Sequence, residues 1–90
     1  VEGHMVYLAL DRASALSAIA AAKRGGDAVW VGSDALSEEE HHRFGSEGVN
    51  VTRFIYPLTG AEAAVVEDAL ASVEEHHPGE IIWVQHVPKP

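Results

Sequence analysis

Two stretches of this chain, residues 5–10 and 81–84, are apolar without interruption. A strand with one face in water alternates apolar and polar residues, whereas a strand covered on both faces is apolar throughout. A parallel sheet with helices packed on both sides provides that cover. The two runs therefore favour an α/β fold built on a parallel sheet.

Helix-like and strand-like segments alternate between these runs. Residues 12–24 form an alanine-rich amphipathic stretch, for which Asp11 or Ser14 is the candidate N-cap, and a Gly-Gly pair stops it. Residues 28–31 are apolar and β-branched in part, which predicts a second strand. The chain thus begins as strand, helix, strand.

A capping-box motif, Ser37 with Glu40, predicts a short helix over residues 37–44. Its apolar content is low, so we expect it to lie on the surface. Residues 49–58 are rich in β-branched and aromatic residues and predict the third strand. Arg53 within that strand indicates an edge or a partly exposed face.

A second capping-box motif, Thr59 with Glu62, predicts the start of a longer amphipathic helix that ends at Pro78-Gly79. The residues of its expected inner face recur at helical spacing and are Ala63, Val66, Leu70 and Val73. Residues 81–87 then form the fourth strand.

The predicted order is therefore strand, helix, strand, short helix, strand, helix, strand. Right-handed crossovers turn this order into a small open four-stranded α/β sheet, mainly parallel, with strand order 2-1-3-4 and helices packed on it. The alternative treats residues 34–48 as a loop, which gives a ferredoxin-like βαββαβ sandwich. One sheet face of that sandwich is bare, so it would form a face-to-face dimer.

The chain is expected to hold one domain. Gly3-His4-Met5 before an apolar run is typical of the remnant of a cleaved expression tag, so we assign residues 1–4 to a tag. Residues 5–88 form the single α/β domain, and residues 89–90 are a short tail.

Charge and composition limit the classes of partner. The net charge of −8 repels phosphate backbones and anionic lipids, so we expect neither nucleic acid nor a membrane as partner. The chain has no cysteine, which excludes disulfides, thiol nucleophiles and thiolate metal sites. No targeting signal is visible, and a cytoplasmic protein fits these features best.

Polar residues follow the predicted strands, where ligands bind in open parallel sheets. The candidate ligand-binding residues at this rim are Asp11, Arg12, Ser33, Asp34, Thr59 and His86. Several of them are also the residue types that cap helices and form turns. A pocket lined by Trp30, Tyr56 or His86 would favour a ligand site, and side chains fully used as caps would favour a structural role.

Acidic and histidine residues cluster at two predicted helices. In the first cluster, Glu38 and His42 are one helical turn apart and are candidate ligands for a divalent metal. The more general interpretation is a solvated helix surface. No phosphate-binding glycine motif is present, so we expect no cofactor.

The two tryptophans, Trp30 and Trp83, each lie within a predicted strand. We expect core positions in which the indole N–H finds a local acceptor; a tryptophan on an edge strand would instead be a candidate interface anchor. The sequence favours a non-enzymatic protein-interaction or accessory module that binds a protein partner or forms a homodimer. The alternative is a small-molecule-binding or hydrolytic domain that uses the rim.

Overall fold

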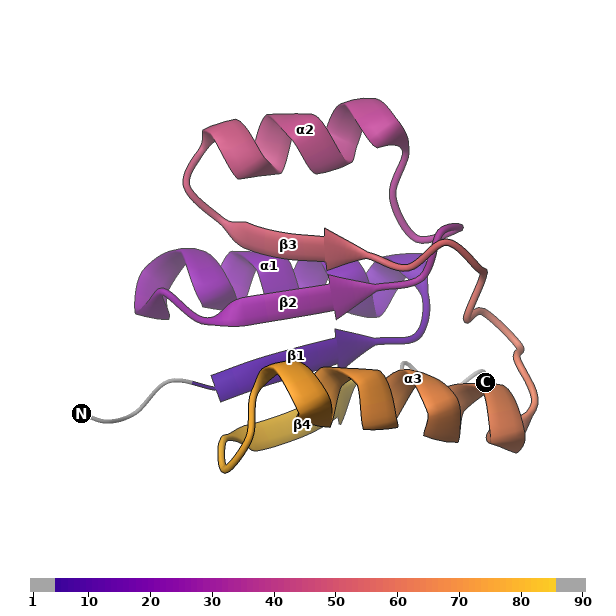
Figure 1. Ribbon diagram of the computed structural model, residues 1–90. Helices are drawn as coiled ribbons and strands as arrows, with labels where there is room; N and C mark the ends of the chain where they lie inside the picture. Colours follow the sequence, from indigo (N-terminus) through magenta and orange to yellow (C-terminus); the bar gives the residue numbers. More distant parts are fainter. Residues whose placement is uncertain (1–4, 86–90) are drawn as a thin grey trace.

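The computed structural model describes residues 5–85, which form one sheet and three helices. Strands and helices alternate strictly along the chain (Figure 1). In chain order the elements are β1 (Met5–Ala9), α1 (Arg12–Gly25), β2 (Ala28–Val31), α2 (Glu38–Ser46), β3 (Asn50–Arg53), α3 (Ala63–His76) and β4 (Ile81–Gln85).

All four strands are parallel, so the predicted α/β class is confirmed and the ferredoxin-like alternative is excluded. The observed strand order is β3-β2-β1-β4, in which β1 lies between β2 and β4; the expected order 2-1-3-4 placed the third strand beside the first. Two ion pairs, Arg12–Glu40 and Lys23–Glu47, join α2 to α1 on one side of the sheet. When two successive right-handed crossovers run on the same side of a sheet, each new strand is added further along in the same direction. This places β3 beyond β2, on the side away from β1.

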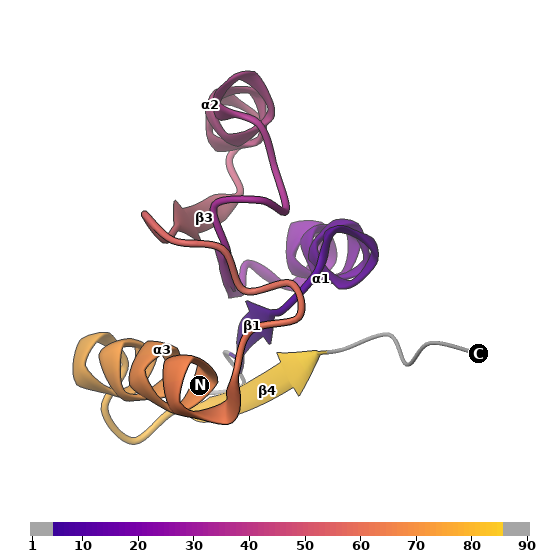
Figure 2. The same ribbon diagram turned by 90° about the vertical axis from the view of Figure 1, so that its right-hand side faces the viewer.

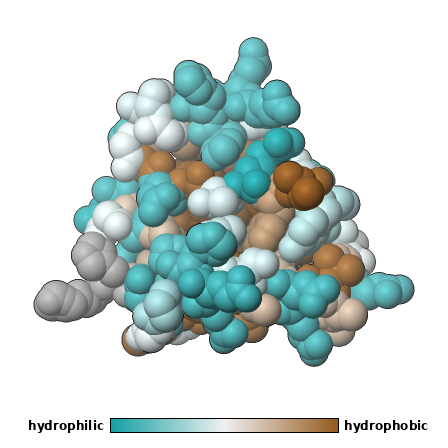
Figure 3. All heavy atoms as spheres, viewed as in Figure 1, coloured by the Kyte–Doolittle hydropathy of each residue, from teal (hydrophilic) through white to brown (hydrophobic). Residues whose placement is uncertain are grey.

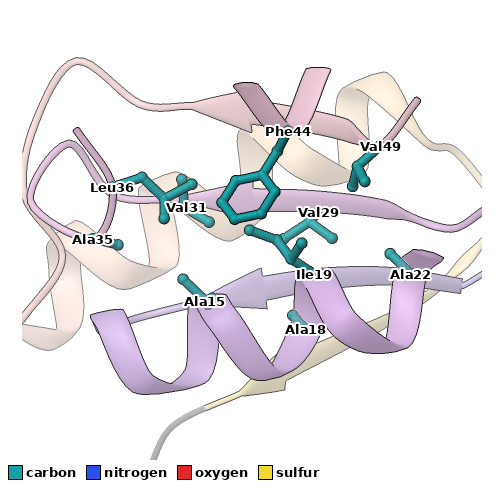
Figure 4. Close-up of a cluster of buried hydrophobic side chains, with 11 residues drawn as sticks. Ala15, Ala18, Ile19, Ala22, Val29, Val31, Ala35, Leu36, Phe44 and Val49 are labelled. Atoms are coloured by element: carbon teal, nitrogen blue, oxygen red, sulfur yellow. The ribbon is translucent and has the colours of Figure 1, made fainter. Parts of the chain in front are cut away.

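α1 and α3 lie on opposite sides of the sheet (Figure 2), and each face of the sheet has its own hydrophobic core. On the α1 side, Phe44 of α2 packs with Ile19 of α1 and with Val29 and Val31 of β2 (Figure 4). On the α3 side, the buried strand residues pack against α3, whose own buried residues are Ala69 and Val73. Alanines on α1 let this helix lie close to the sheet, because their side chains end at the β-carbon.

Two predicted boundaries are wrong, both around the segment after β3. The third strand ends at Arg53 rather than at residue 58, and the following residues cross the carboxyl ends of the strands. The second capping box is not formed: Glu62 is the N-cap residue of α3 but accepts no side-chain capping bond. The Thr59 hydroxyl donates to the Leu10 carbonyl instead (3.3 Å). A tertiary contact has replaced the local one.

The inner face of α3 is also rotated relative to the prediction. Ala63 is exposed, Val66 and Leu70 are half-buried, and Ala69 and Val73 are the buried residues. The predicted short helix α2 is confirmed, and its capping box between Ser37 and Glu40 is formed in both directions. None of the helices within residues 5–85 is long and apolar enough to cross a membrane.

Trp30 is buried on the α3 face, as predicted, with 7% of its surface exposed. Its indole N–H donates to Nε2 of His77 at the end of α3 (3.1 Å). The Trp30 ring also contacts the rings of Phe54 and His76, with centroids 5.3 and 5.2 Å apart. The prediction of a core tryptophan with a local acceptor is confirmed.

Candidate functional site

The rim residues are largely engaged in holding the fold together. Asp11 is the N-cap of α1: its Oδ1 accepts from the backbone N–H of Ser14 (2.8 Å), and the Ser14 hydroxyl completes a capping box. Arg12 points to α2, where its guanidinium makes two contacts with the Glu40 carboxylate (2.8 and 2.7 Å) and donates to the Ala35 carbonyl. The bidentate bond from Arg12 lowers the pKa of Glu40 to about 2.

Asp34 anchors the segment that crosses the carboxyl ends of the strands. Its Oδ1 accepts from the backbone N–H of Leu58 (3.2 Å). Burial opposes ionisation of Asp34, but hydrogen bonding to Thr59 and to nearby backbone amides outweighs it and lowers the pKa of Asp34 below its usual value. Gly32 permits this approach, because a β-carbon there would lie 2.7 Å from the Leu58 nitrogen.

The structure therefore brings some of the predicted rim residues together and separates others. Asp34 and Thr59 are hydrogen-bonded, and Thr59 reaches the end of β1 next to Asp11. The Ser33 backbone joins the same segment, since its N–H donates to the Tyr56 carbonyl (3.0 Å). Arg12 turns away towards α2. His86 lies outside the described residues.

The observed strand order also moves the topological switch point. The first three strands follow one another in one direction across the sheet, whereas β4 lies on the opposite side of β1. The crevice at which open α/β sheets bind ligands therefore lies between the carboxyl ends of β1 and β4. Gln85 ends β4 there, and its buried Oε1 has no hydrogen-bond partner in the part of the chain that the structure describes. Sequence reasoning missed Gln85, although a polar residue after four apolar ones was a signal.

The proposed metal ligands lie on the exposed surface of α2. Glu38 and His42 are both exposed. Within residues 5–85, no group of three or more histidine, aspartate or glutamate side chains is placed to hold a metal ion.

An open cavity of about 500 Å³ lies between the segment after β3 and the N-terminal half of α3. Tyr56, Pro57, Ala61 and Val65 give it a largely apolar lining, while Thr59 and Asp68 contribute polar groups. It meets part of the criterion for a ligand pocket, because Tyr56 lines it; the rim candidate Thr59 lines it as well. The face of the molecule on which α3 lies is otherwise mostly hydrophilic (Figure 3).

The least expected surface is the outer strand β4, which lies at one end of the sheet (Figure 1). Its apolar run predicted cover on both faces, and that prediction is wrong: Ile81, Trp83 and Val84 are 65%, 54% and 44% exposed. Registered neighbours share a sheet face, so Ile81 and Trp83 lie on the α1 face and Val84 lies on the α3 face. Because α1 lies mainly over β1 and β2, it leaves its face of β4 largely bare.

The opposite edge strand, β3, is protected in two ways. α2 packs beside it, and Nε2 of His41 donates to the Val51 carbonyl (2.8 Å). Arg53 at the end of β3 adds a charge, and its guanidinium binds the Leu36 and Ser33 carbonyls. Charges and covering elements are the usual means of preventing edge-to-edge association. β4, in contrast, contains no charged residue between positions 81 and 85.

Comparisons with models of known protein families, with characterised proteins and with solved structures find no match for this chain. The surfaces described above are therefore the features from which a function can be proposed.

Proposed function

We propose that this chain is a non-enzymatic protein-interaction module that binds a partner protein along the free edge of β4. The observation that carries the proposal is the exposure of Ile81, Trp83 and Val84 on an uncharged edge strand. The outer edge of such a strand presents backbone N–H and C=O groups that an added strand can pair with. A tryptophan in the middle of that strand is the residue type that most often anchors an interface.

The state of the rim supports the same proposal. Asp11, Arg12, Asp34 and Thr59 are each engaged by a cap, an ion pair or a tertiary hydrogen bond. These contacts account for the polar residues at the strand ends without a substrate. The contrast between the protected edge at β3 and the bare edge at β4 further supports an interface at β4.

A random twelve-residue peptide library, displayed on phage, provides the test. Peptides selected on the purified chain are measured against Trp83→Lys and against the matched control Ile55→Lys, which changes a residue that is 95% exposed outside β4. We expect selected peptides to shift the backbone amide resonances of residues 81–85. Because a central tryptophan dominates many interfaces, Trp83→Lys should weaken binding about tenfold or more, while Ile55→Lys leaves it unchanged.

Equal binding to both variants would overturn the proposal, as would a selection that yields no peptide acting on residues 81–85. Both variants change exposed residues, so circular dichroism and thermal melting should confirm that they fold like the parent chain.

The cavity beside Tyr56 and Val65 favours a second candidate, a small-molecule-binding domain. A fragment screen read by amide resonances tests it, with Val65→Trp as the variant that fills the cavity. Fragment binding that Val65→Trp abolishes, together with no peptide binding at β4, would replace the first proposal by the second.

A further inference from the structure

A groove of about 360 Å³ runs between α3 and β4, on the α3 side of the free edge. Leu70 of α3 and two residues of β4, Ile82 and Val84, supply its apolar lining. Glu74, His77 and Glu80 supply its polar groups. The groove therefore continues the exposed surface of β4 and combines apolar and acidic side chains.

The hydrogen bonds of His77 determine the charge of the groove. An indole N–H can only donate, so the bond from Trp30 requires an unprotonated Nε2 on His77. The remaining ring proton is then on Nδ1, which lies 3.4 Å from Oε2 of Glu80. His77 is thus neutral in this arrangement, and the carboxylates of Glu74 and Glu80 are the only charged side chains that line the groove within the described part of the chain.

We infer that the partner contributes a strand that pairs with β4 and places a basic side chain next to Glu74 and Glu80. This inference rests on the proposed function and names the chemistry of its partner. A lysine or arginine next to two carboxylates is attracted to them, whereas an aspartate or glutamate at the same place would be repelled. The net charge of −8 for the whole chain also favours the approach of a basic partner.

The geometry of an added strand predicts the pattern of the partner sequence. Alternate side chains of a strand point to the same face, and paired strands lie about 4.8 Å apart. One face of the partner strand therefore meets the groove, where a basic residue lies beside Glu80 and an apolar residue lies beside Ile82, two positions along. The residue between them lies on the other face, next to Ile81, and is apolar.

A second copy of this chain fits the groove less well. Antiparallel pairing of two β4 strands about a twofold axis perpendicular to the sheet would place two α3 helices side by side on one face. Residues 81–85 contain no lysine or arginine, so the paired strand of a second copy would bring no basic side chain to Glu74 and Glu80. Charge complementarity thus selects a basic partner over a homodimer.

Three synthetic peptides of the form Thr-Thr-Xaa-Ile-Val-Thr-Xaa-Thr test the inference, where both variable positions are Lys, Gln or Glu. The variable positions and the central valine share one face, so the design works in either strand direction. Binding is measured from the amide resonances of residues 81–85 at low salt. We expect the Lys peptide to bind at least about threefold more tightly than the Gln peptide, and the Glu peptide to bind most weakly.

The paired variant Glu74→Gln/Glu80→Gln should remove the preference for the Lys peptide, whereas Glu67→Gln, which changes a glutamate of α3 outside the groove lining, should keep it. High salt should reduce the preference because it screens exposed charges. Equal binding of all three peptides at residues 81–85 would overturn the basic partner and leave the proposed function standing. The same conclusion would follow if none of the three peptides bound while the library peptides did bind at residues 81–85. A concentration-dependent dimer in sedimentation, blocked by Trp83→Lys, would identify a second copy as the occupant.

Discussion

Replacing Gly32 by alanine tests how closely the segment after β3 packs on the end of β2. Gly32 lies directly after β2, and a β-carbon there would lie 2.7 Å from the Leu58 nitrogen and 2.9 Å from the Leu58 β-carbon. Comfortable contacts between such atoms are about 3.5–4.0 Å, so the Leu58 backbone must retreat by roughly 0.8 Å. Leu58 is 1% exposed, and its retreat disturbs the core on the α3 face.

The expected cost follows from three effects. Overpacking of this kind costs about 1–3 kcal/mol. The hydrogen bond from the Leu58 N–H to Asp34 lengthens, which adds roughly 0.5–1.5 kcal/mol. Alanine restricts the unfolded chain more than glycine does, which offsets about 0.4–1 kcal/mol of the lost stability. We therefore expect a net loss of about 2 kcal/mol in the free energy of unfolding, or a decrease of roughly 8–16 °C in Tm for a chain of this size.

Urea denaturation followed by circular dichroism measures this loss, and Gly45→Ala is the matched control. Gly45 lies within α2, and a β-carbon there meets nothing within 4 Å, so alanine should stabilise the chain by about 0.5–1 kcal/mol. If Gly32→Ala were as stable as the parent, the close approach of Leu58 would be wrong.

Two further predictions concern charges and hydrogen bonds. Arg12→Gln should return the pKa of Glu40 from about 2 towards its ordinary 4.5, as followed by carboxyl resonances; an unchanged pKa would refute the ion pair. Since the pKa of Glu40 is lowered on folding, its contribution to stability is complete above pH 4.5 and is lost as the pH falls towards 2. Trp30→Phe should cost about 1–3 kcal/mol in urea denaturation, because Nε2 of His77 loses its donor. Nitrogen resonances of His77 in the parent chain should show the proton on Nδ1, and a proton on Nε2 would contradict the assignment.

Local signals in the sequence predicted the elements well. The capping box at Ser37 placed the start of α2, and Asp11, one of the two N-cap candidates, caps α1. These motifs are satisfied within a few residues, so neighbouring elements hardly affect them. The motif at Thr59 had the same form, but its hydroxyl found an acceptor at Leu10, at the end of β1. Whether a local hydrogen bond forms depends on which distant groups the fold brings close to it. Residue types and their spacing along the chain do not specify those tertiary contacts.

The position of each strand in the sheet was harder to predict. An apolar run indicates a strand covered on both faces, yet β4 has the same composition with both faces partly exposed. The difference comes from where α1 and α3 lie, which depends on the direction of each crossover. The candidate interface follows from that arrangement, so Trp83 could be named from sequence only on the condition that its strand is an edge. Ile81 and Val84 carried no signal at all, since their residue types also suit a buried strand.

The central place of β1 also has a consequence for how the chain acquires its structure during synthesis. β1 leaves the ribosome before the other three strands and finds β2 after one helix, but its other neighbour, β4, is made after β2 and β3. The core between the sheet, α1 and α2 can condense early, because all of its residues precede α3. Until α3 follows, Val6, Leu8 and Trp30 remain open to water on the other face. Such a nascent chain presents a transient apolar surface, and the rate at which α3 and β4 emerge determines how long that surface stays exposed.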